Sequence, residues 1–259
     1  MPSVMLPSAN VDTNAIVALI ALVAAVFTFV EYYSKYPSLV EFRDAPPFNR
    51  VRFASLLFTV FLLCTIFQGQ FAPTTLTKFV GAIGALIGHV IDFPFSPVNL
   101  VVNMLPEHAS AKSVNLIRAA AGISYLISLL TLAAFLVLLR LQGWPSADTP
   151  FNVWVNLPTF DPSTGSDVVA RLRRDGYVNI ILGFTLPFLL PLAIGSASRL
   201  FTPIALDYPQ TMVWTMTIWA FLPVSLFMRG IAMRRIASMV QEKRKRTAAL
   251  AERKGFSLA

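Results

Sequence analysis

The sequence predicts an all-α, polytopic helical membrane protein with five transmembrane helices and one short re-entrant or interfacial helix at about residues 79–91. Only 13% of the 259 residues are charged, about half the share found in an average soluble domain, and the mean hydropathy is +0.65. The charges also collect in short polar segments between long apolar runs. This distribution is typical of a chain that crosses a bilayer several times.

Five apolar runs are long enough to cross the hydrocarbon layer, which takes about 20 residues of helix. Tyrosine and tryptophan side chains lie near the ends of these runs, at the level expected for lipid headgroups. Pro187, Pro191 and Pro223 predict kinks in the last two runs, which transporters use to expose backbone carbonyls but which also occur in inert membrane helices. The predicted spans are residues 13–33, 53–71, 114–139, 177–198 and 211–228.

The segment at residues 79–105 is apolar on average but does not match a full span. Asp92, Pro94 and Pro97 interrupt it, and proline inside a helix removes a backbone hydrogen bond. Its first part, residues 79–91, is too short to cross the bilayer and suits a half-inserted or interfacial helix.

The basic residues predict the orientation, because lysine and arginine are enriched in cytoplasmic loops. With five spans and the N-terminus outside, all but four of the 21 basic residues lie inside, whereas six spans would export the cluster at residues 35–52. We expect a single transmembrane domain at residues 1–228 and a basic cytoplasmic C-terminal tail at residues 229–259. A bacterial inner membrane is expected, since no basic residues of an import signal precede the first span.

The C-terminal tail concentrates positive charge, with nine basic residues against two glutamates between Arg229 and Lys254. A basic cluster beside a span attracts anionic lipids, and each basic residue contributes about 1 kcal/mol near the surface. Nucleic-acid binding is not expected, because the tail lacks interleaved aromatic residues and a recognised nucleic-acid-binding fold. The predicted anionic-lipid contacts are Arg234, Arg235, Lys243, Arg244, Lys245 and Arg246.

Small residues recur at helical spacing within residues 79–91. Gly81 with Ala85, and Gly84 with Gly88, form two pairs of residues four positions apart. Such pairs let a second backbone approach closely, which is a main source of helix association in lipid. These four residues are therefore predicted helix contacts, either with another span of the same chain or with a separate subunit.

His89 follows Ala85 by four residues, so on a helix the small side chain leaves room for a flat ring beside the imidazole. This spacing is similar to the Ala-xxx-His arrangement of bacterial light-harvesting polypeptides, in which the histidine ligates the magnesium of a bacteriochlorophyll. The resemblance implies a pigment or ligand contact at His89, with a tetrapyrrole as cofactor. The alternative is a hydrogen-bonded interface residue near Asp92.

Catalytic motifs are missing from the sequence, which has no phosphate loop, no Gly-x-Ser-x-Gly elbow, no His-Glu-x-x-His and no Cys-x-x-Cys. One cysteine and two histidines are too few for a cysteine and histidine zinc cluster. We therefore expect no enzyme and no metal site, and the sequence requires no cofactor.

The predicted span cores contain no charged side chain, whereas ion-coupled carriers and proton relays usually need one. Aromatic, proline-containing loops at residues 34–52 and 142–176 suit binding to a partner. We expect a non-enzymatic accessory, structural or assembly subunit of a larger membrane complex, whose partners are the lipid bilayer and other integral membrane subunits.

Two alternative functions remain open on the sequence. The first is a small oligomeric transporter or channel for an uncharged or small solute, and a polar stripe facing a water-filled path would favour it. The second is a pigment-binding membrane subunit, through His89. The hydroxyl residues that could line a solute path are Thr185, Ser196, Thr215 and Thr217.

Overall fold

The computed structural model describes residues 1–7, 11–106, 109–144, 152–160, 167–200 and 208–253. Within these ranges the chain is helical, without strands, and five helices are long and apolar enough to cross a membrane. The predicted class of polytopic helical membrane protein is confirmed. The five long helices are α2 (Val11–Tyr33), α3 (Phe48–Gln68), α6 (Ala111–Leu141), α8 (Val168–Leu200) and α9 (Pro209–Arg253).

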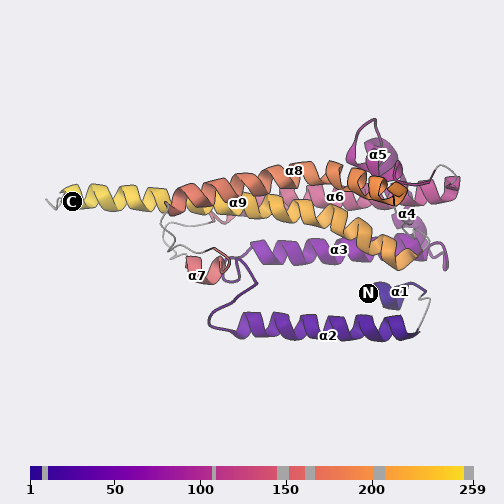
Figure 1. Cartoon of the computed structure of the whole chain (residues 1–259), viewed down its shortest axis with the longest axis horizontal. Coiled ribbons are helices and arrows are strands. Elements are labelled where there is room, and N and C mark those ends of the chain that lie inside the picture. The colour runs from indigo at the N-terminus through magenta and orange to yellow at the C-terminus, as the bar shows by residue number, and fades with distance from the viewer. Residues whose placement is uncertain (8–10, 107–108, 145–151, 161–166, 201–207, 254–259) are drawn as a thin grey trace.

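The long helices lie along one axis and alternate in direction, as five successive crossings require (Figure 1). One end of the bundle holds residues 34–47, the start of α8 and residues 229–253 of α9; we call it the basic end. The opposite end holds the start of α6 and most of the short helices. The short helices are α1 (Pro2–Met5), α4 (Thr75–Ile91), α5 (Pro97–Val102) and α7 (Val153–Asn156), of which α7 lies near the basic end.

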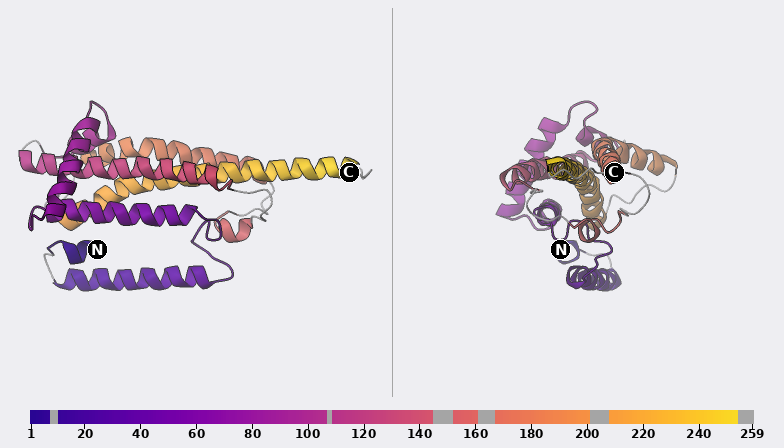
Figure 2. Two further views of the ribbon diagram at one scale, coloured as in Figure 1. Left: turned by 180° about the vertical axis from the view of Figure 1, so that it is seen from behind. Right: turned by 90° about the vertical axis from the view of Figure 1, so that its left-hand side faces the viewer.

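Helix α4 is the short helix that the sequence predicts, and it lies across the end of the bundle rather than along it (Figure 2). It begins with a reciprocal cap, in which the Thr77 amide donates to the Thr74 hydroxyl and the Thr74 amide donates to the Thr77 hydroxyl. It ends at Asp92, two residues before Pro94. Its 17 residues and its crosswise course fit an interfacial helix.

Asp92 ties α4 to α5 and α6. Its carboxylate accepts hydrogen bonds from Asn99 Nδ2 at 2.8 Å and from Arg118 Nε at 2.6 Å. Burial alone would raise the pKa of Asp92, but the bonds from Asn99 and Arg118 and the positive charge of Arg118 together lower that pKa below its ordinary value. The charged carboxylate therefore helps to hold the crosswise helix on the bundle.

Glycines let α4 and α6 approach to backbone contact. A Cβ atom added at Gly88 would lie 2.5 Å from the Arg118 carbonyl oxygen, and one at Gly122 would lie 2.5 Å from the Gly88 Cα. At Gly84 the added atom would lie 3.0 Å from the Ala119 carbonyl oxygen. Gly84 and Gly88 therefore contact another span of the same chain.

A second close approach, which the sequence does not predict, joins α8 to α9. A Cβ atom added at Gly230 would lie 2.6 Å from the Gly176 carbonyl oxygen. One at Gly183 would lie 2.7 Å from the Phe227 ring and 2.8 Å from the Pro223 carbonyl oxygen. The two last spans thus pack as an antiparallel pair with little side-chain volume between them (Figure 1).

Helix α9 continues without a break through the domain boundary expected after residue 228. Its 45 residues extend roughly 68 Å at 1.5 Å per residue, more than twice the hydrocarbon thickness of about 30 Å. Apolar side chains recur beyond the boundary, and Ala232, Met233, Ile236 and Ala237 are buried in the bundle. Arg234 and Ser238 are exposed between these buried positions, most side chains from residue 242 onward are exposed, and residues 254–259 lie outside the described residues.

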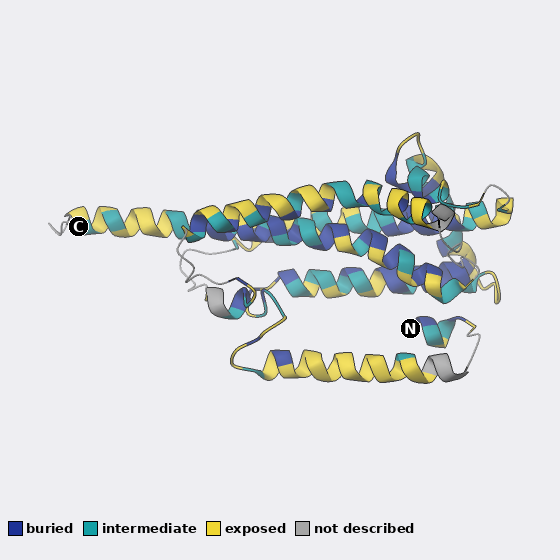
Figure 3. Cartoon of the chain, viewed as in Figure 1, coloured by how far each residue is buried: buried dark blue, intermediate teal, exposed yellow. Residues whose placement is uncertain are grey.

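Buried residues lie along the inner sides of the bundle helices (Figure 3), and their side chains form two clusters. One lies toward the α4 end and includes Leu63, Cys64 and Met216; the other lies toward the basic end and includes Phe42 and Phe135. Helix α2 contributes to neither cluster. The bundle proper therefore consists of α3, α6, α8 and α9, with α4 and α5 across one end.

Candidate functional site

The connection from α2 to α3 at residues 34–47 is fastened to the end of α2 by Glu31. The Glu31 carboxylate accepts the backbone amides of residues 38–40 at 2.9–3.2 Å and the Ser38 hydroxyl at 2.6 Å. Arg43 Nη1 donates to the Glu31 carbonyl oxygen at 3.1 Å, near the C-terminus of α2. Because so many donors converge on one carboxylate, the end of α2 and this loop form one ordered unit.

Glu41 joins the same loop to α9 at the basic end. Its two carboxylate oxygens accept Arg229 Nε at 2.6 Å and Arg229 Nη2 at 2.7 Å. The Thr159 hydroxyl donates to Glu41 at 2.8 Å, and Asn49 Nδ2 donates to the Glu41 carbonyl oxygen at 2.8 Å. The bidentate pair fixes both charges in place, so the charge of Arg229 is balanced by Glu41.

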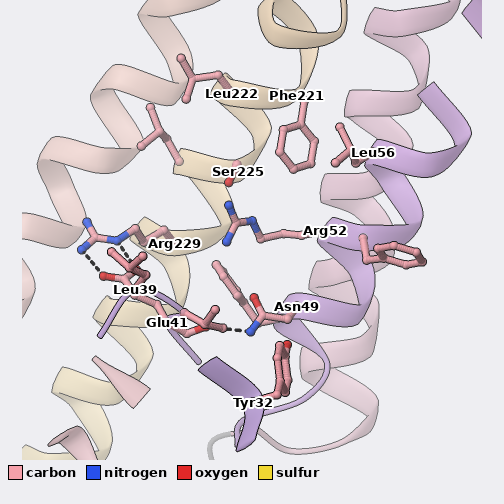
Figure 4. A pocket seen from close by; sticks show the side chains of 14 residues that line it. Tyr32, Leu39, Glu41, Asn49, Arg52, Leu56, Phe221, Leu222, Ser225 and Arg229 are labelled. Carbon is pink, nitrogen blue, oxygen red and sulfur yellow. Dashed lines mark hydrogen bonds and ion pairs between the residues drawn. The ribbon is translucent and has the colours of Figure 1, made fainter. Parts of the chain in front are cut away.

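Arg52, near the start of α3, extends into the space between α3 and α9 (Figure 4). The central carbon of its guanidinium lies 5.4 Å from the Phe48 ring centroid and 5.9 Å from the Phe221 ring centroid. Its Nε atom is buried and has no hydrogen-bond partner among the described residues. The aromatic faces attract the cation, but they leave this N–H donor without an acceptor.

A cavity of about 530 Å³ surrounds Arg52, within the range of roughly 300–1,000 Å³ found for small-molecule sites. Arg52, Glu41 and Arg229 form its polar part, and Tyr32 at the end of α2 also lines it. The apolar wall follows one side of α3 and α9 away from the basic end (Figure 4). This wall is formed by Phe53, Leu56, Phe221, Leu222 and Leu226.

The second candidate surface is α2 itself, which stands apart from the bundle along most of its length (Figures 1 and 3). Only 6% of the most apolar 18-residue stretch of α2 is buried, compared with 11% for α8, 33% for α6, 44% for α3 and 56% for α9. Its described side chains from Ala15 to Val30 are exposed, apart from half-buried Val17. An apolar helix of membrane-spanning length therefore has almost no cover from its own chain.

Only some of the small residues predicted as helix contacts pack closely against a neighbouring helix. Gly84 and Gly88 are buried against α6, whereas a Cβ atom added at Gly81 would meet nothing within 4 Å. Gly81 and Ala85 are only half-buried. The close contact therefore follows one of the two predicted pairs, because the other pair lies on a different side of α4.

His89 lies near the C-terminus of α4 with its ring exposed. Its Nδ1 atom lies 2.7 Å from the Ala85 carbonyl oxygen, which leaves Nε2 as the nitrogen available to an outside ligand. In the described part of the chain, no three histidine, cysteine, aspartate or glutamate side chains come close enough to hold a metal ion. The pigment contact at His89 stays a prediction.

The predicted lipid-contact residues of α9 fall into two groups. Arg235 Nη1 donates to the carbonyl oxygens of Leu139 and Trp144, so this residue faces the C-terminus of α6 instead of extending outward. Arg234 is exposed, and its guanidinium carbon lies 4.3 Å from the Tyr177 ring centroid. The other four predicted contacts are exposed, and one of them also pairs with Asp167 at 2.7 Å; they are Lys243, Arg244, Lys245 and Arg246.

The Arg244 pair lowers the pKa of Asp167, chiefly because the Arg244 side chain donates a hydrogen bond to the Asp167 carboxylate. The pair lies at the surface, where solvent weakens such attraction. It fastens the start of α8 to α9 without forming a pocket. Of the loop expected at residues 142–176, the structure places residues 153–156 in α7 and residues 168–176 in α8, while residues 145–151 and 161–166 are outside the described residues.

Arg52 is not among the site residues that the sequence predicts. Arg52 falls at the end of the expected loop, because a hydropathy-based prediction starts the span at the first residue after the last charged side chain. The helix begins earlier, at Phe48, directly after Pro46 and Pro47. The proline pair is the local signal that a helix can begin here, because proline is favoured next to helix starts.

No family model, no curated protein and no solved structure matches the chain.

Proposed function

We propose that this protein is a non-enzymatic integral membrane subunit that helps to assemble or brace a larger membrane protein complex. The proposal rests on the exposure of α2. This apolar helix is long enough to span the membrane, and only 6% of its most apolar 18-residue stretch is buried. Such a helix presents nearly its whole surface to lipid and to other membrane proteins. We infer that α2 is the docking helix for another integral membrane subunit.

The way in which α2 is attached supports docking. Glu31 and Arg43 hold its C-terminal end to an ordered loop, and Phe42 of that loop is fully buried in the bundle. The base of α2 is therefore held by the bundle while the rest of the helix stands free. An arm with an ordered base presents its surface at a defined position, which lowers the entropic cost of binding.

The two faces of α2 differ in side-chain size. Ala18, Ala21 and Ala25 follow the helical spacing of one face, and all three are exposed. Val23 and Val30 lie on the opposite face, where the side chains are large. A small-residue face allows another helix to approach closely, and such packing drives helix association in lipid.

The hydroxyl groups also favour a subunit over a solute carrier. Thr185 and Thr217, which could line a path, donate to the carbonyl oxygens four residues earlier in their own helices. The buried Thr131 hydroxyl donates to Ser55 at 2.9 Å and joins α6 to α3. Hydroxyls used in this way brace the bundle, because their protons are donated to oxygens of the chain itself.

The proposed setting is a bacterial inner membrane with the basic end in the cytoplasm. The bundle end that holds residues 34–47 also holds the basic part of α9 (Figure 1), and clusters of lysine and arginine favour the cytoplasmic side. In this orientation α2 enters from the outside and its fastened end lies at the inner headgroup level.

The test is co-purification from native membranes in mild detergent, followed by quantitative mass spectrometry. We expect a stoichiometric membrane protein partner with the natural chain. The double variant Ala21→Leu with Ala25→Leu should reduce its recovery several-fold, because larger side chains on this face hold the two helices apart.

The matched control is Val23→Leu with Val30→Leu, which enlarges the opposite face of α2 and should leave the partner bound. Equal loss of the partner in both double variants would contradict a specific docking face. A homo-oligomer without any other protein would contradict the subunit proposal and favour a small transporter or channel.

A further inference from the structure

Arg52 carries a positive charge and forms no hydrogen bond or ion pair with the described residues around it. The cavity also contains Glu41 and Arg229, but those two residues pair with each other through two short hydrogen bonds. Glu41 attracts Arg52 through space while Arg229 repels it, and the groups in direct contact with the guanidinium are the uncharged rings of Phe48 and Phe221. The cavity therefore has one excess positive charge beside a buried N–H donor that has no acceptor among the described residues.

An unpaired cation in partly apolar surroundings is unfavourable unless an anion or an acceptor joins it. A planar guanidinium with free N–H donors suits an oxyanion, above all a phosphate or carboxylate group. Asn49 and Ser225 also line the cavity and offer neutral polar groups beside this charge. The polar part of the cavity thus has the chemistry of a site for one phosphate group.

The other part of the cavity suits a hydrocarbon chain. Leu56, Phe221 and Leu222 continue from Arg52 along α3 and α9 in the direction away from the basic end (Figure 4). Tyr32, at the end of α2, lines the opposite part of the cavity, beyond Asn49 (Figure 4), and tyrosines are enriched at the headgroup region. A phosphate at Arg52 would therefore lie at headgroup depth with the apolar wall leading toward the bilayer centre.

We propose that this cavity binds one anionic phospholipid, with its phosphodiester on Arg52 and the start of an acyl chain along Phe221 and Leu222. A volume of about 530 Å³ holds the headgroup region, while the chains continue into the bilayer. A single excess positive charge selects a lipid of net charge −1 over a zwitterionic one. This site is separate from the exposed basic residues of α9 and does not depend on the docking role of α2.

The experiment compares lipid binding to the full chain by native mass spectrometry in a zwitterionic detergent. The probes are phosphatidylglycerol and phosphatidylcholine with identical acyl chains. The natural chain should retain one phosphatidylglycerol in preference to phosphatidylcholine. Arg52→Gln should weaken that preference by about tenfold, as expected for the loss of a charge-assisted hydrogen bond.

The matched control is Arg50→Gln, which removes the same charge two residues away from an exposed position outside the cavity. This variant should keep the preference for phosphatidylglycerol. An equal loss in the Arg50 and Arg52 variants would overturn the proposal, because it would reveal only a general attraction of surface charge for anionic lipid.

Two further measurements keep the proposal testable if Arg52→Gln does not fold. The melting temperature of the natural chain should rise more with phosphatidylglycerol than with phosphatidylcholine, and an equal rise would overturn the proposal. Inorganic phosphate at the same concentration should not displace the lipid. Displacement would overturn the lipid assignment and leave a site for a free anion.

Discussion

At the scale of single residues, the prolines of the last two spans show how this bundle uses freed backbone groups. Pro191 has no N–H, so the carbonyl oxygen of Pro187 loses its helical partner. The indole N–H of Trp219 donates to that oxygen at 3.0 Å, and Trp219 is buried. The carbonyl therefore joins α8 to α9 and is not exposed to a solute, as it would be in a carrier with broken helices.

We predict that Trp219→Phe lowers the free energy of unfolding by about 1–3 kcal/mol, because a buried carbonyl loses its only donor from α9. The measurement is denaturant unfolding of the detergent-solubilised protein. Trp214→Phe serves as control, since Trp214 lies on the same helix with 44% of its surface exposed. Equal stability losses in the two variants would rule out a specific role for the bond.

At the scale of helices, the glycines decide which elements touch. Small residues four positions apart predict a contact face on α4, but the same pattern fits a partner in another protein. The structure places Gly88 against Gly122 and Arg118 of α6, so that this contact lies within the chain. Gly176 and Gly230 make a second such contact between α8 and α9.

We predict that Gly88→Leu destabilises the protein by about 1–3 kcal/mol or more, because the added side chain would collide with the backbone of α6. Gly81→Leu is the matched control: it makes the same change on the same helix, where an added Cβ meets nothing within 4 Å. Thermal unfolding in detergent distinguishes the two. A Gly81 variant that loses as much stability as the Gly88 variant would contradict this account of the contact.

At the scale of the whole molecule, alternating helices bring the basic segments together. Residues 34–47 and the later part of α9 lie at one end of the bundle, although more than 180 residues separate Arg43 from Arg229 in the chain. The start of α6, with Lys112, lies at the other end. This arrangement is what the predicted five-span topology requires.

We predict that Tyr36→Cys and Thr247→Cys react with a membrane-impermeant thiol reagent only after permeabilisation, whereas Lys112→Cys reacts in intact cells. The native Cys64 is fully buried, which keeps the background low. Ser38 is unsuitable for a probe because its hydroxyl binds Glu31. Labelling of Tyr36→Cys and Lys112→Cys from the same side would contradict the five-span topology.

The sequence by itself determined the number of spans, their approximate positions and the short helix before Asp92. Each crossing of a bilayer requires about 20 consecutive apolar residues with few or no charges. The number and positions of the spans can therefore be predicted from short stretches of sequence. The helices α3, α8 and α9 extend beyond the predicted spans, because hydropathy detects only the part of a helix that lies in hydrocarbon. The continuation of α9 past the predicted span brings Ala232, Met233, Ile236 and Ala237 into the buried core, which hydropathy did not predict.

Three features were decided only by the tertiary structure. They are the position of Arg52 in the cavity, the packing of Gly88 against α6, and the separation of α2 from the bundle. Each of these depends on contacts between residues far apart in the chain, and the local pattern is the same whether a helix face meets its own chain, a partner or lipid. The charge balance at Arg52 also depends on Glu41 pairing with Arg229. Long-range packing therefore created the cavity and left α2 exposed.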